Sequence, residues 1–418
     1  MLKAAINEHI KTLMRKWGHC PYHLSARPDE HDCQCAVDAV NRALRDVPYY
    51  RDYKVEVKSV DDFERLPIIT KRDVLDAQAQ AFISRRVCRW ATITKETGGT
   101  SGISLTVVRR PVDQLHYLQV ANYAFSLIGK NLKVATLRGE KPGNGAIAQK
   151  VGPTLRLSSY QLNDANLDHY LHALEQNKIS CLHVYPSSVV ILARLIKRRY
   201  GHVDLPALKG VFASSEIFSR EDKKLVKEAF NGVKIVDFYG LNELCCAAIA
   251  VDFEPYQFFY DYGFVEFVDD GQKLPSGNRL ASIVATSVMN KTMPLVRYDT
   301  LDHVELNEQG EAIAIIGRTS DFLVNKQLQL TPCIFVNRDI SFRHVVNFQY
   351  YQDTPGKLVF RVVSDGGFGP EDEANVLTDL RQSFLNMDTS VELVEQIEKT
   401  KVGKQKRLIQ LLDIDKYK

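Results

Sequence analysis

The stretch SCLHVYPSSVVILARLIKRRYGHVDLPALKGVFA, residues 180–213, decides the fold class of this chain. A strand-like apolar run at 180–184 is followed by helical periodicity over 187–199 and by a second apolar run at 210–213. A helix over 221–230 and a strand over 234–239 continue the alternation. Strands that alternate with helices in this way predict a largely parallel sheet flanked by helices.

The flanking segments extend this pattern. Upstream, we expect helices over 36–50 and 166–176, short helices that start at Ser59 and Thr70, and a strand over 133–137. Downstream, short strands predict a smaller antiparallel sheet over 258–268, 280–286, 302–306 and 312–316. A compact α+β unit follows, with strands over 344–351, 357–363 and 390–393 and a helix over 370–385.

The predicted fold is therefore α/β, with two domains. A large N-terminal domain over 1–319 contains mostly parallel sheets and a small antiparallel β subdomain, and a small α+β domain covers 320–418.

The composition is that of an ordinary globular protein, since 45% of the 418 residues are hydrophobic and 25% are charged. The formal net charge of +3 is too small to indicate a nucleic-acid or membrane partner. No apolar run reaches the ~20 residues that a membrane helix needs. Residues 1–5 lead into charged residues without an apolar signal core. We therefore expect a cytoplasmic protein with reduced cysteines.

One cluster of cysteines and histidines near the N-terminus has the residue types of a zinc site. It consists of His19, Cys20, His23, His31, Cys33 and Cys35. The two-residue spacing that is usual between paired zinc ligands is missing, and no second cysteine pair answers Cys33 and Cys35. A structural metal and ordinary surface and core residues both remain open. The adjacent Cys245 and Cys246 are expected to pack as small apolar groups.

A glycine-rich run lies between an apolar segment and a strand-like segment at 105–108. It consists of Thr97, Gly98, Gly99, Thr100, Ser101 and Gly102, and we call it the phosphate loop. Glycines at this spacing let backbone N–H groups point at one spot, and the hydroxyls add donors for an anion. The run therefore favours a phosphate chain as ligand, although an ordinary turn has the same composition.

Polar residues follow the ends of two predicted strands, where open α/β sheets bind ligands. Ser214, Ser215 and Glu216 follow one strand, and Tyr239, Gly240, Asn242 and Glu243 end the next. A carboxylate such as Glu243 can hold Mg²⁺ beside bound phosphates. Further along, Asp302 can accept hydrogen bonds from ribose hydroxyls, and Arg318 and Lys404 supply positive charge.

The order of these segments resembles the adenylate-forming superfamily, which contains acyl-CoA synthetases, peptide-synthetase adenylation domains and luciferases. The phosphate loop, Ser-Ser-Glu, Tyr-Gly-x-x-Glu, Arg-Tyr-x-Thr-x-Asp, Gly-Arg-x-x-Asp and a late Gly-Lys occur in that family's order. Residues 47–51, 66–73 and 293–298 are similar to the phenylacetate–CoA ligase branch. The resemblance covers nearly the whole chain.

The resemblance implies a role for each segment. The phosphate loop would hold the β- and γ-phosphates of ATP, Ser214–Glu216 would line the adenine, and Tyr239 and Gly240 would lie against it. Asp302 would hold the ribose, Arg318 would reach the ribose or the phosphates, and Asn242 would contact the α-phosphate. Glu243 would bind Mg²⁺. Ser320 would be the hinge of a mobile C-terminal domain, and Lys404 would lie over the α-phosphate during adenylation.

The implied activity is the ATP-dependent activation of a carboxylic acid as an acyl-adenylate, followed by transfer to CoA, a carrier-protein thiol or an amine. Tyr123, Tyr185 and Phe238 suit a pocket for an aromatic or other flat acid. The alternatives are a nucleotidyltransferase that places AMP on a hydroxyl and a non-enzymatic nucleotide-binding relative. Whether the protein forms a homodimer is left open.

Three positions depart from the family pattern. Asn242 stands where the family usually has Thr or Ser, and Ser320 replaces the frequent hinge Asp, with Asp321 beside it. Gln327 stands where relatives that make CoA thioesters usually have a glycine, which puts the CoA step in question more than adenylation. Residues 252–262 lack the Cys and His ligands of zinc-containing relatives, so no zinc is expected there.

Overall fold

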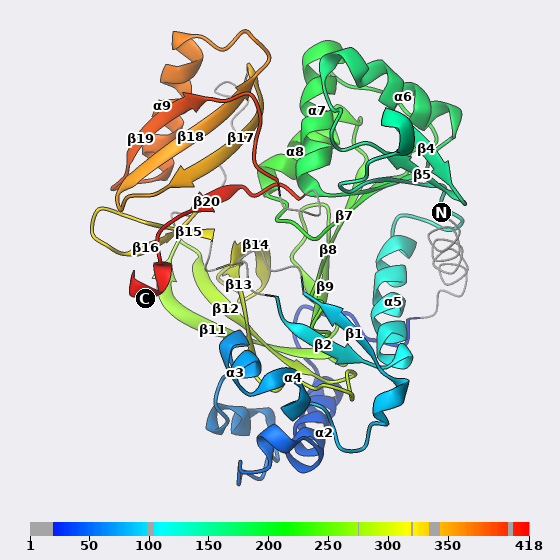
Figure 1. The fold of residues 1–418 in the computed structure, drawn as a ribbon, viewed down its shortest axis with the longest axis vertical. Coiled ribbons are helices and arrows are strands. Elements are labelled where there is room, and N and C mark those ends of the chain that lie inside the picture. Colours follow the sequence, from blue (N-terminus) through cyan, green and yellow to red (C-terminus); the bar gives the residue numbers. More distant parts are fainter. Residues whose placement is uncertain are drawn as a thin grey trace. The chain divides into compact units, whose positions relative to one another are not determined.

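The computed structural model describes residues 20–97, 104–274, 276–318, 321–333, 343–399 and 404–417 (Figure 1). Contacts divide the chain into two compact units. Unit one joins Asn131–Ile235 to Ile316–Lys418, and unit two joins Ile10–Lys130 to Val236–Ile315.

The α/β series predicted from residues 180–213 forms the first part of unit one. Its elements are β3 (Val134–Leu137), β4 (Ala148–Val151), β5 (Thr154–Leu157), α6 (Leu167–Gln176), β6 (Cys181–Val184), α7 (Pro186–Tyr200), β7 (Gly210–Ser214) and α8 (Arg220–Ala229). β6 pairs in parallel with both β3 and β7, β3 pairs in parallel with β5, and β4 is antiparallel to β5. Apolar side chains of these strands and of α6, α7 and α8 form one buried core. The predicted parallel series is confirmed.

The C-terminal part of unit one is an α+β layer. Its elements are β15 (Phe322–Val324), β16 (Leu330–Pro332), β17 (Val345–Gln352), β18 (Lys357–Ser364), α9 (Pro370–Ser383), β19 (Asp388–Leu393) and β20 (Leu408–Gln410). Four of the strands form a sheet of order β19-β18-β17-β20, in which only the β17–β18 pair is antiparallel. Val376 and Leu380 of α9 pack into the buried core of this layer.

Unit two begins with helices and a hairpin. The longer elements are α2 (Glu30–Asp46), α3 (Lys71–Asp76), α4 (Gln78–Ala81), β1 (Ile93–Glu96), β2 (Thr106–Arg109) and α5 (Pro111–Ser126). Short 3-10 helices are Pro48–Tyr50, Val60–Arg65 and Arg89–Ala91, and unit one has others at Gly143–Gly145, Asp164–Asn166 and Ile414–Tyr417. Asp29 and Asp32 form a capping box that starts α2, and Thr70 and Asp73 form one that starts α3.

The remaining strands are β8 (Lys234–Gly240), β9 (Ala247–Val251), β10 (Gln257–Phe258), β11 (Gly263–Lys273), β12 (Arg279–Ser287), β13 (Tyr298–Leu306) and β14 (Ala312–Arg318). β9 pairs antiparallel with both β8 and β10. A second sheet has the order β11-β12-β13-β14, as predicted for the antiparallel subdomain.

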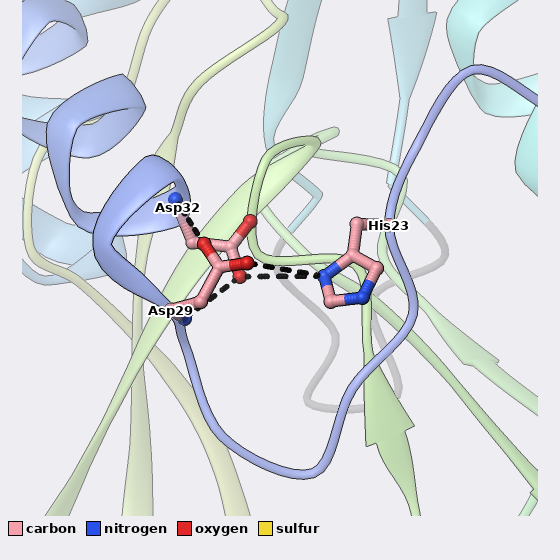
Figure 2. A group of neighbouring side chains, drawn as sticks. All are labelled: His23, Asp29 and Asp32. Carbon is pink, nitrogen blue, oxygen red and sulfur yellow. Dashed lines mark hydrogen bonds and ion pairs between the residues drawn. The ribbon is translucent and has the colours of Figure 1, made fainter.

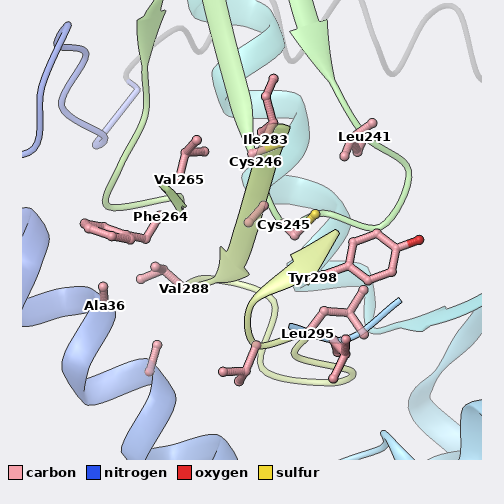
Figure 3. Close-up of a cluster of buried hydrophobic side chains, with 14 of the residues drawn as sticks. Ala36, Leu241, Cys245, Cys246, Phe264, Val265, Ile283, Val288, Leu295 and Tyr298 are labelled. Carbon is pink, nitrogen blue, oxygen red and sulfur yellow. The ribbon is translucent and has the colours of Figure 1, made fainter. Parts of the chain in front are cut away.

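The core of unit two packs α2 and the short N-terminal helices against β9, β11 and β12 (Figure 3). Cys245 and Cys246 are fully buried in this core, which confirms that they pack as small apolar groups. Gly263 opens β11 because a Cβ atom at this position would lie 2.0 Å from the carbonyl oxygen of Cys245. The tight approach of two backbones therefore requires glycine here.

Three details of the predicted elements were wrong or incomplete. No helix was predicted for α5, because its apolar residues are spread around the helix rather than gathered on one face. The single strand expected over 258–268 is two strands, because the chain turns at Phe259–Tyr262 between β10 and β11. α2 begins at Glu30, six residues before the expected start at 36.

The contact-based units differ from the predicted domains 1–319 and 320–418. Residues 316–418 share a unit with 131–235, and residues 236–315 belong to the other unit. The movement of residues 320–418 as one body stays a prediction.

Candidate functional site

The residues predicted to bind ATP fall into two groups, one built in each unit. The group in unit one consists of Ser214, Ser215, Glu216, Arg318 and Lys404. The group in unit two consists of Thr97, Tyr239, Gly240, Asn242, Glu243 and Asp302. The phosphate-loop residues Gly98, Gly99, Thr100, Ser101 and Gly102 and the predicted hinge Ser320 lie outside the described residues.

In unit one, three parallel strands bring polar residues to one edge of the sheet. Arg138, Tyr185 and Ser215 each directly follow the end of a strand, namely β3, β6 and β7. The Arg138 guanidinium donates a hydrogen bond of 3.0 Å to the Ser215 hydroxyl and lies 5.0 Å from the centre of the Tyr185 ring. The carboxyl edge of a parallel sheet is where such folds bind ligands, so Ser214–Glu216 occupy the expected place.

Glu216 links two segments of unit one. One carboxylate oxygen accepts a hydrogen bond of 2.9 Å from the backbone N–H of Ser187, in the first turn of α7. The other accepts one of 3.2 Å from the backbone N–H of Gln405. Burial raises the pKa of Glu216, while the bonds from Ser187 and the charges of Arg407 and Lys404 act in the opposite direction. The carboxylate therefore lies among donors and cations that favour its charged form.

Lys404 lies at this same sheet edge. Its ammonium is 5.7 Å from the centre of the Tyr185 ring. Burial lowers the pKa of Lys404, the charge of Glu216 acts to raise it, and those of Arg138 and Arg318 lower it further. A late lysine and the predicted adenine segment are thus neighbours within one unit, and the lysine lies among one carboxylate and two guanidinium groups.

Arg318 is positioned by a tight turn at the end of β14. Gly317 has φ of 120°, and its added Cβ would meet the Ile217 side chain at 2.7 Å. The carboxylate of Asp321 accepts a hydrogen bond of 3.1 Å from the backbone N–H of Arg318. The Gly-Arg-x-x-Asp pattern therefore describes a turn in which the glycine and the aspartate have structural roles.

In unit two, the phosphate loop connects the antiparallel hairpin β1–β2. Thr97 closes its base, because its backbone N–H donates to the carbonyl of Leu105 at 2.9 Å and its hydroxyl accepts from the N–H of Leu105 at 2.9 Å. Ser104, which stands where a proline is frequent, donates a hydrogen bond of 2.6 Å to the carbonyl of Thr97. The hairpin thus fixes both ends of the loop.

Tyr239 and Asp302 are joined directly. The Tyr239 hydroxyl donates a hydrogen bond of 2.8 Å to the Asp302 carboxylate. Burial and the charge of Asp302 raise the pKa of Tyr239 well above its ordinary value, so this hydroxyl keeps its proton. Asp302 is 6% exposed and its backbone N–H donates to the hydroxyl of Thr300. Tyr239 and Asp302, whose predicted roles are separate contacts to adenine and ribose, are thus joined by a hydrogen bond.

Asn242 and Glu243 follow the end of β8. The Asn242 side chain is exposed, whereas Glu243 is buried at 7% exposure. The buried guanidinium of Arg109 donates a hydrogen bond of 2.6 Å to the carbonyl of Asn242, and the Asn290 amide donates to the carbonyl of Glu243 at 3.3 Å. The backbone of this turn is therefore held from two sides.

The predicted acyl-pocket aromatics lie in different units. In unit two, the Phe238 ring packs edge-on against Tyr117 at 6.0 Å, and Tyr123 packs edge-on against Phe259 at 5.8 Å. A Cβ atom on Gly240 would lie 3.1 Å from the Phe238 ring, so glycine leaves room for this ring. Tyr185 belongs to unit one, where its ring contacts Arg138 and Lys404 instead.

Three of the predicted segments contain a non-glycine residue in the left-handed region. Ser215 has φ of 73°, Leu244 of 58° and Leu301 of 61°. Each is part of, or adjacent to, a residue predicted to bind the nucleotide. Left-handed backbone costs free energy in residues with a Cβ atom, and such strain concentrates at functional sites.

No protein-family model matches the chain. Over 161 residues it is 27% identical to phenylacetate-coenzyme A ligase from Pseudomonas putida, which covers 36% of this chain and 36% of that protein. The match therefore spans about a third of that relative. The structure of 2-hydroxyisobutyryl-CoA ligase in complex with R3-HIB-AMP aligns with a TM-score of 0.64 over 92% of this chain and 90% of that chain, at 16% identity.

This chain has the fold of the adenylate-forming enzymes. The amide bond synthetase McbA from Marinactinospora thermotolerans shares it, with a TM-score of 0.51, 17% identity and coverage of 82% of this chain and 75% of that chain. The resemblance and the fold class expected from the ordered motifs are confirmed.

Two of the motifs that carry the resemblance, Leu-Pro and Arg-Tyr, have a structural role. The buried Arg297 guanidinium donates hydrogen bonds to the carbonyls of Phe63 and Leu66 at 2.9 and 2.7 Å and pairs with Glu266 at 2.9 Å. Ile69 pairs with Tyr298 in an isolated bridge. The Leu-Pro and Arg-Tyr motifs therefore accompany each other because they pack together.

Sequence reasoning missed Arg109 and Arg138. Arg109 holds the carbonyl of Asn242, and Arg138 contacts Ser215 and Tyr185. Each lies at the end of a strand, Arg109 as the last residue of β2 and Arg138 directly after β3. An arginine at the end of an apolar strand was the available signal, because the carboxyl ends of strands position ligand-binding residues.

In the part of the chain that the structure describes, no three members of the predicted cysteine and histidine cluster bring their ligand atoms together. Among the described residues, the three-ligand group here is His23, Asp29 and Asp32, with His23 Nδ1 3.8 Å from an oxygen of each carboxylate (Figure 2). Both carboxylates already form the capping box of α2. Cys35 contacts only His31 within the cluster, at 3.5 Å, and His19 lies outside the described residues. The capping role explains the acidic pair without a metal.

Among the residues described, every helix is too short or too polar to cross a lipid bilayer.

Proposed function

We propose that the protein is an adenylate-forming ligase. It activates a carboxylic acid with ATP as an acyl-adenylate and then transfers the acyl group to a thiol or an amine. The observation that carries this proposal is the convergence in unit one, where the Lys404 ammonium lies 5.7 Å from the centre of the Tyr185 ring and the N–H of Gln405 donates to Glu216 at 3.2 Å, at the carboxyl edge of a parallel sheet. A general nucleotide-binding fold does not require a lysine from the end of the chain at this edge.

In the proposed adenylation step, an oxygen of the acid's carboxylate attacks the α-phosphorus of ATP, and the bond to pyrophosphate breaks. Both reactants are anions, so their repulsion is a large part of the barrier. Lys404 places an ammonium where the new bond forms and thereby stabilises the transition state. Arg318 and Arg138 add positive charge for the phosphates, and the backbone of Ser214–Glu216 faces the adenine.

Unit two supplies the other contacts to ATP in this proposal. The phosphate loop binds the β- and γ-phosphates through backbone N–H groups. Tyr239 lies against the adenine, Asp302 accepts from the ribose hydroxyls, and the amide of Asn242 donates to the α-phosphate. These roles rest on the family resemblance and on the short Tyr239–Asp302 hydrogen bond.

Glu243 is the proposed Mg²⁺ ligand. Mg²⁺ in nucleotide sites is usually held by one or two carboxylates together with substrate phosphates, so a single buried carboxylate fits. When bound, Mg²⁺ neutralises charge on the phosphates. The role of the protein is to fix the carboxylate, through the hydrogen bonds that Arg109 and Asn290 make to the backbone of residues 242 and 243.

We propose an aromatic or other flat acid as substrate, because Phe238, Tyr117 and Tyr123 provide aromatic surface in unit two. The relative from Pseudomonas putida is named for phenylacetate and coenzyme A, and McbA for amide bond synthesis. CoA, a carrier-protein thiol and an amine are therefore the acceptors to compare. A cytoplasmic location and motion of residues 320–418 about Ser320 belong to the same proposal.

The test uses the full chain with ATP, Mg²⁺ and one acid at a time from a panel of phenylacetate, 2-hydroxyisobutyrate and other carboxylic acids. We expect one of these acids to drive the exchange of labelled pyrophosphate into ATP and to give an acyl-AMP mass. AMP attached to a hydroxyl compound, with no exchange for any acid, would identify a nucleotidyltransferase instead. No heat-stability shift with ATP would indicate that the nucleotide does not bind at all.

A further inference from the structure

The segment that carries Lys404 is attached to two parts of unit one. Lys399 and Gln405 pair as an isolated antiparallel bridge, and the N–H of Lys406 donates to the carbonyl of Glu398 at 3.4 Å. The Gln405 side chain donates to the carbonyl of Phe348 at 2.7 Å, and the N–H of Tyr350 donates to the carbonyl of Arg407 at 2.8 Å. These contacts bind the segment to β17.

A second set of contacts binds the same segment to residues 131–235. The Lys399 ammonium donates to the carbonyl of Ser159 at 3.1 Å, on one side of Lys404. On the other side, the N–H of Gln405 donates to Glu216 at 3.2 Å, and Arg407 pairs with Asp222 at 2.7 Å. Of these contacts, the hydrogen bond that Glu216 accepts comes from Gln405, the residue directly after Lys404.

Glu216 is itself held in place. Its other oxygen accepts from the N–H of Ser187 at 2.9 Å, in the first turn of α7, where a negative charge is favourable. The carboxylate is therefore fixed at one end to a buried helix and at the other to the backbone of the lysine segment. Its charge also offsets the repulsion that Arg138 and Arg318 exert on Lys404.

We propose that Glu216 is a positioning residue for Lys404, which holds the lysine segment in place through the N–H of Gln405 and is needed for adenylation but not for acyl transfer. This inference rests on the proposed function. It gives the Ser-Ser-Glu segment a second task, because the backbone of Ser214–Glu216 faces the adenine while the Glu216 carboxylate holds the lysine.

The alternative is that Glu216 only lines the adenine or only caps α7. These roles predict different results. If Glu216 only contacts the adenine, its removal changes the KM for ATP. The decrease in activity that it causes then multiplies with the decrease caused by Lys404→Ala. If Glu216 only caps α7, its loss lowers the rates of both half-reactions by similar factors and also lowers the melting temperature. A positioning role affects the kcat of adenylation and acts through Lys404 alone.

The first measurement needs no activity. Hydrogen exchange of the peptide that contains residues 404–410 is followed without ATP in the wild type, in Glu216→Ala and in the control Glu228→Ala. Glu228 pairs with Lys197 at 3.0 Å elsewhere in unit one. We expect exchange at this peptide to become about 10-fold faster or more in Glu216→Ala and to stay unchanged in the control. Unchanged exchange in Glu216→Ala would overturn the proposal.

The second measurement is a double-mutant cycle in pyrophosphate exchange with phenylacetate, or with whichever acid of the panel supports exchange. Glu216→Ala should lower kcat by about 10- to 100-fold, which corresponds to loss of one charge-assisted hydrogen bond, and leave the KM for ATP within about twofold. Glu216→Ala combined with Lys404→Ala should be no slower than Lys404→Ala alone. Losses that multiply, or a raised KM with kcat retained, would overturn the positioning role.

The third measurement supplies synthetic phenylacetyl-AMP and CoA and follows thioester formation. Glu216→Ala should lower this rate far less than that of adenylation, because acyl transfer starts from acyl-AMP, in which the bond that Lys404 is proposed to help form already exists. A loss as large as that in adenylation would assign Glu216 a structural role instead. If the wild type exchanges pyrophosphate with no acid, the proposed function fails, and the hydrogen-exchange result still decides whether Glu216 holds the segment.

Discussion

The Tyr239 hydroxyl donates a hydrogen bond of 2.8 Å to the carboxylate of Asp302. This bond fixes which way the carboxylate faces, and it uses one of its four acceptor positions. A ribose hydroxyl is a donor that such a carboxylate can accept. Two residues that lie far apart in the sequence are thus joined, and in the proposed function they contact the same nucleoside.

We predict that Tyr239→Phe raises the KM for ATP about tenfold with little change in kcat, because the ring remains while Asp302 loses its orienting donor. Asp302→Ala should raise the KM further, and the double variant should equal Asp302→Ala. Steady-state kinetics at varied ATP measures this. The matched control is Tyr256→Phe, which removes a 2.5 Å hydrogen bond to Asp237 in the same unit. A similar KM for Tyr239→Phe and wild type would contradict the role.

Glu243→Gln should shift the Mg²⁺ dependence. The amide keeps the shape of the side chain but removes the charge that attracts a divalent cation, so the half-saturating Mg²⁺ concentration should rise at least about tenfold. Titration of exchange activity with Mg²⁺ measures this shift. The exposed Glu254→Gln serves as control, since it removes an acid elsewhere in unit two. Superimposable titrations for Glu243→Gln and wild type would rule out the assignment.

The pH dependence of adenylation should report Lys404. Its ammonium must be protonated to act, and burial lowers its pKa below the ordinary value of 10.5. The rate should therefore fall as pH rises through a pKa below that value. In Glu216→Gln the attraction of the carboxylate is lost while Arg138 and Arg318 remain, so the alkaline fall should move to lower pH. Lys404→Arg should lose the alkaline fall, because a guanidinium stays charged. A fall at higher pH in Glu216→Gln would contradict this account.

Asp222→Ala should destabilise unit one. The Asp222–Arg407 pair is 2.7 Å long, and its side chains are only 1% and 12% exposed. Removal of one partner leaves a buried charge and should cost about 3–5 kcal/mol of unfolding free energy in chemical denaturation. Asp222→Ala combined with Arg407→Leu should regain much of this loss. The exposed pair Arg361–Glu392 provides the control, since Glu392→Gln should cost no more than about 1 kcal/mol. Equal losses at the two pairs would contradict the prediction.

The sequence was sufficient for elements with a clear periodicity. The βα series over 180–239 could be predicted because apolar runs of strand length alternate with amphipathic helices and end at turn residues. α5 could not, because its apolar residues surround the helix. The turn at Phe259–Tyr262 was hidden in an aromatic run, where tertiary packing rather than a turn residue reverses the chain.

For the candidate site, the sequence identified segments but not their partners. Ser214–Glu216 and Lys404 could each be named from their motifs, yet the hydrogen bond from Gln405 to Glu216 depends on how two distant loops pack. Arg109 and Arg138 belong to no motif, and they enter the site because the strands that precede them end there. The contact of Tyr185 with Lys404 depends on tertiary structure in the same way, and its predicted place in an acyl pocket stays a prediction.

The most direct test of the central claim is acid-dependent exchange of labelled pyrophosphate into ATP by the wild type and by Lys404→Ala, with ATP binding measured in parallel. We predict robust exchange in the wild type with at least one acid, and a loss of about 100-fold or more in Lys404→Ala while ATP still binds with similar affinity. Full exchange in Lys404→Ala would contradict the account.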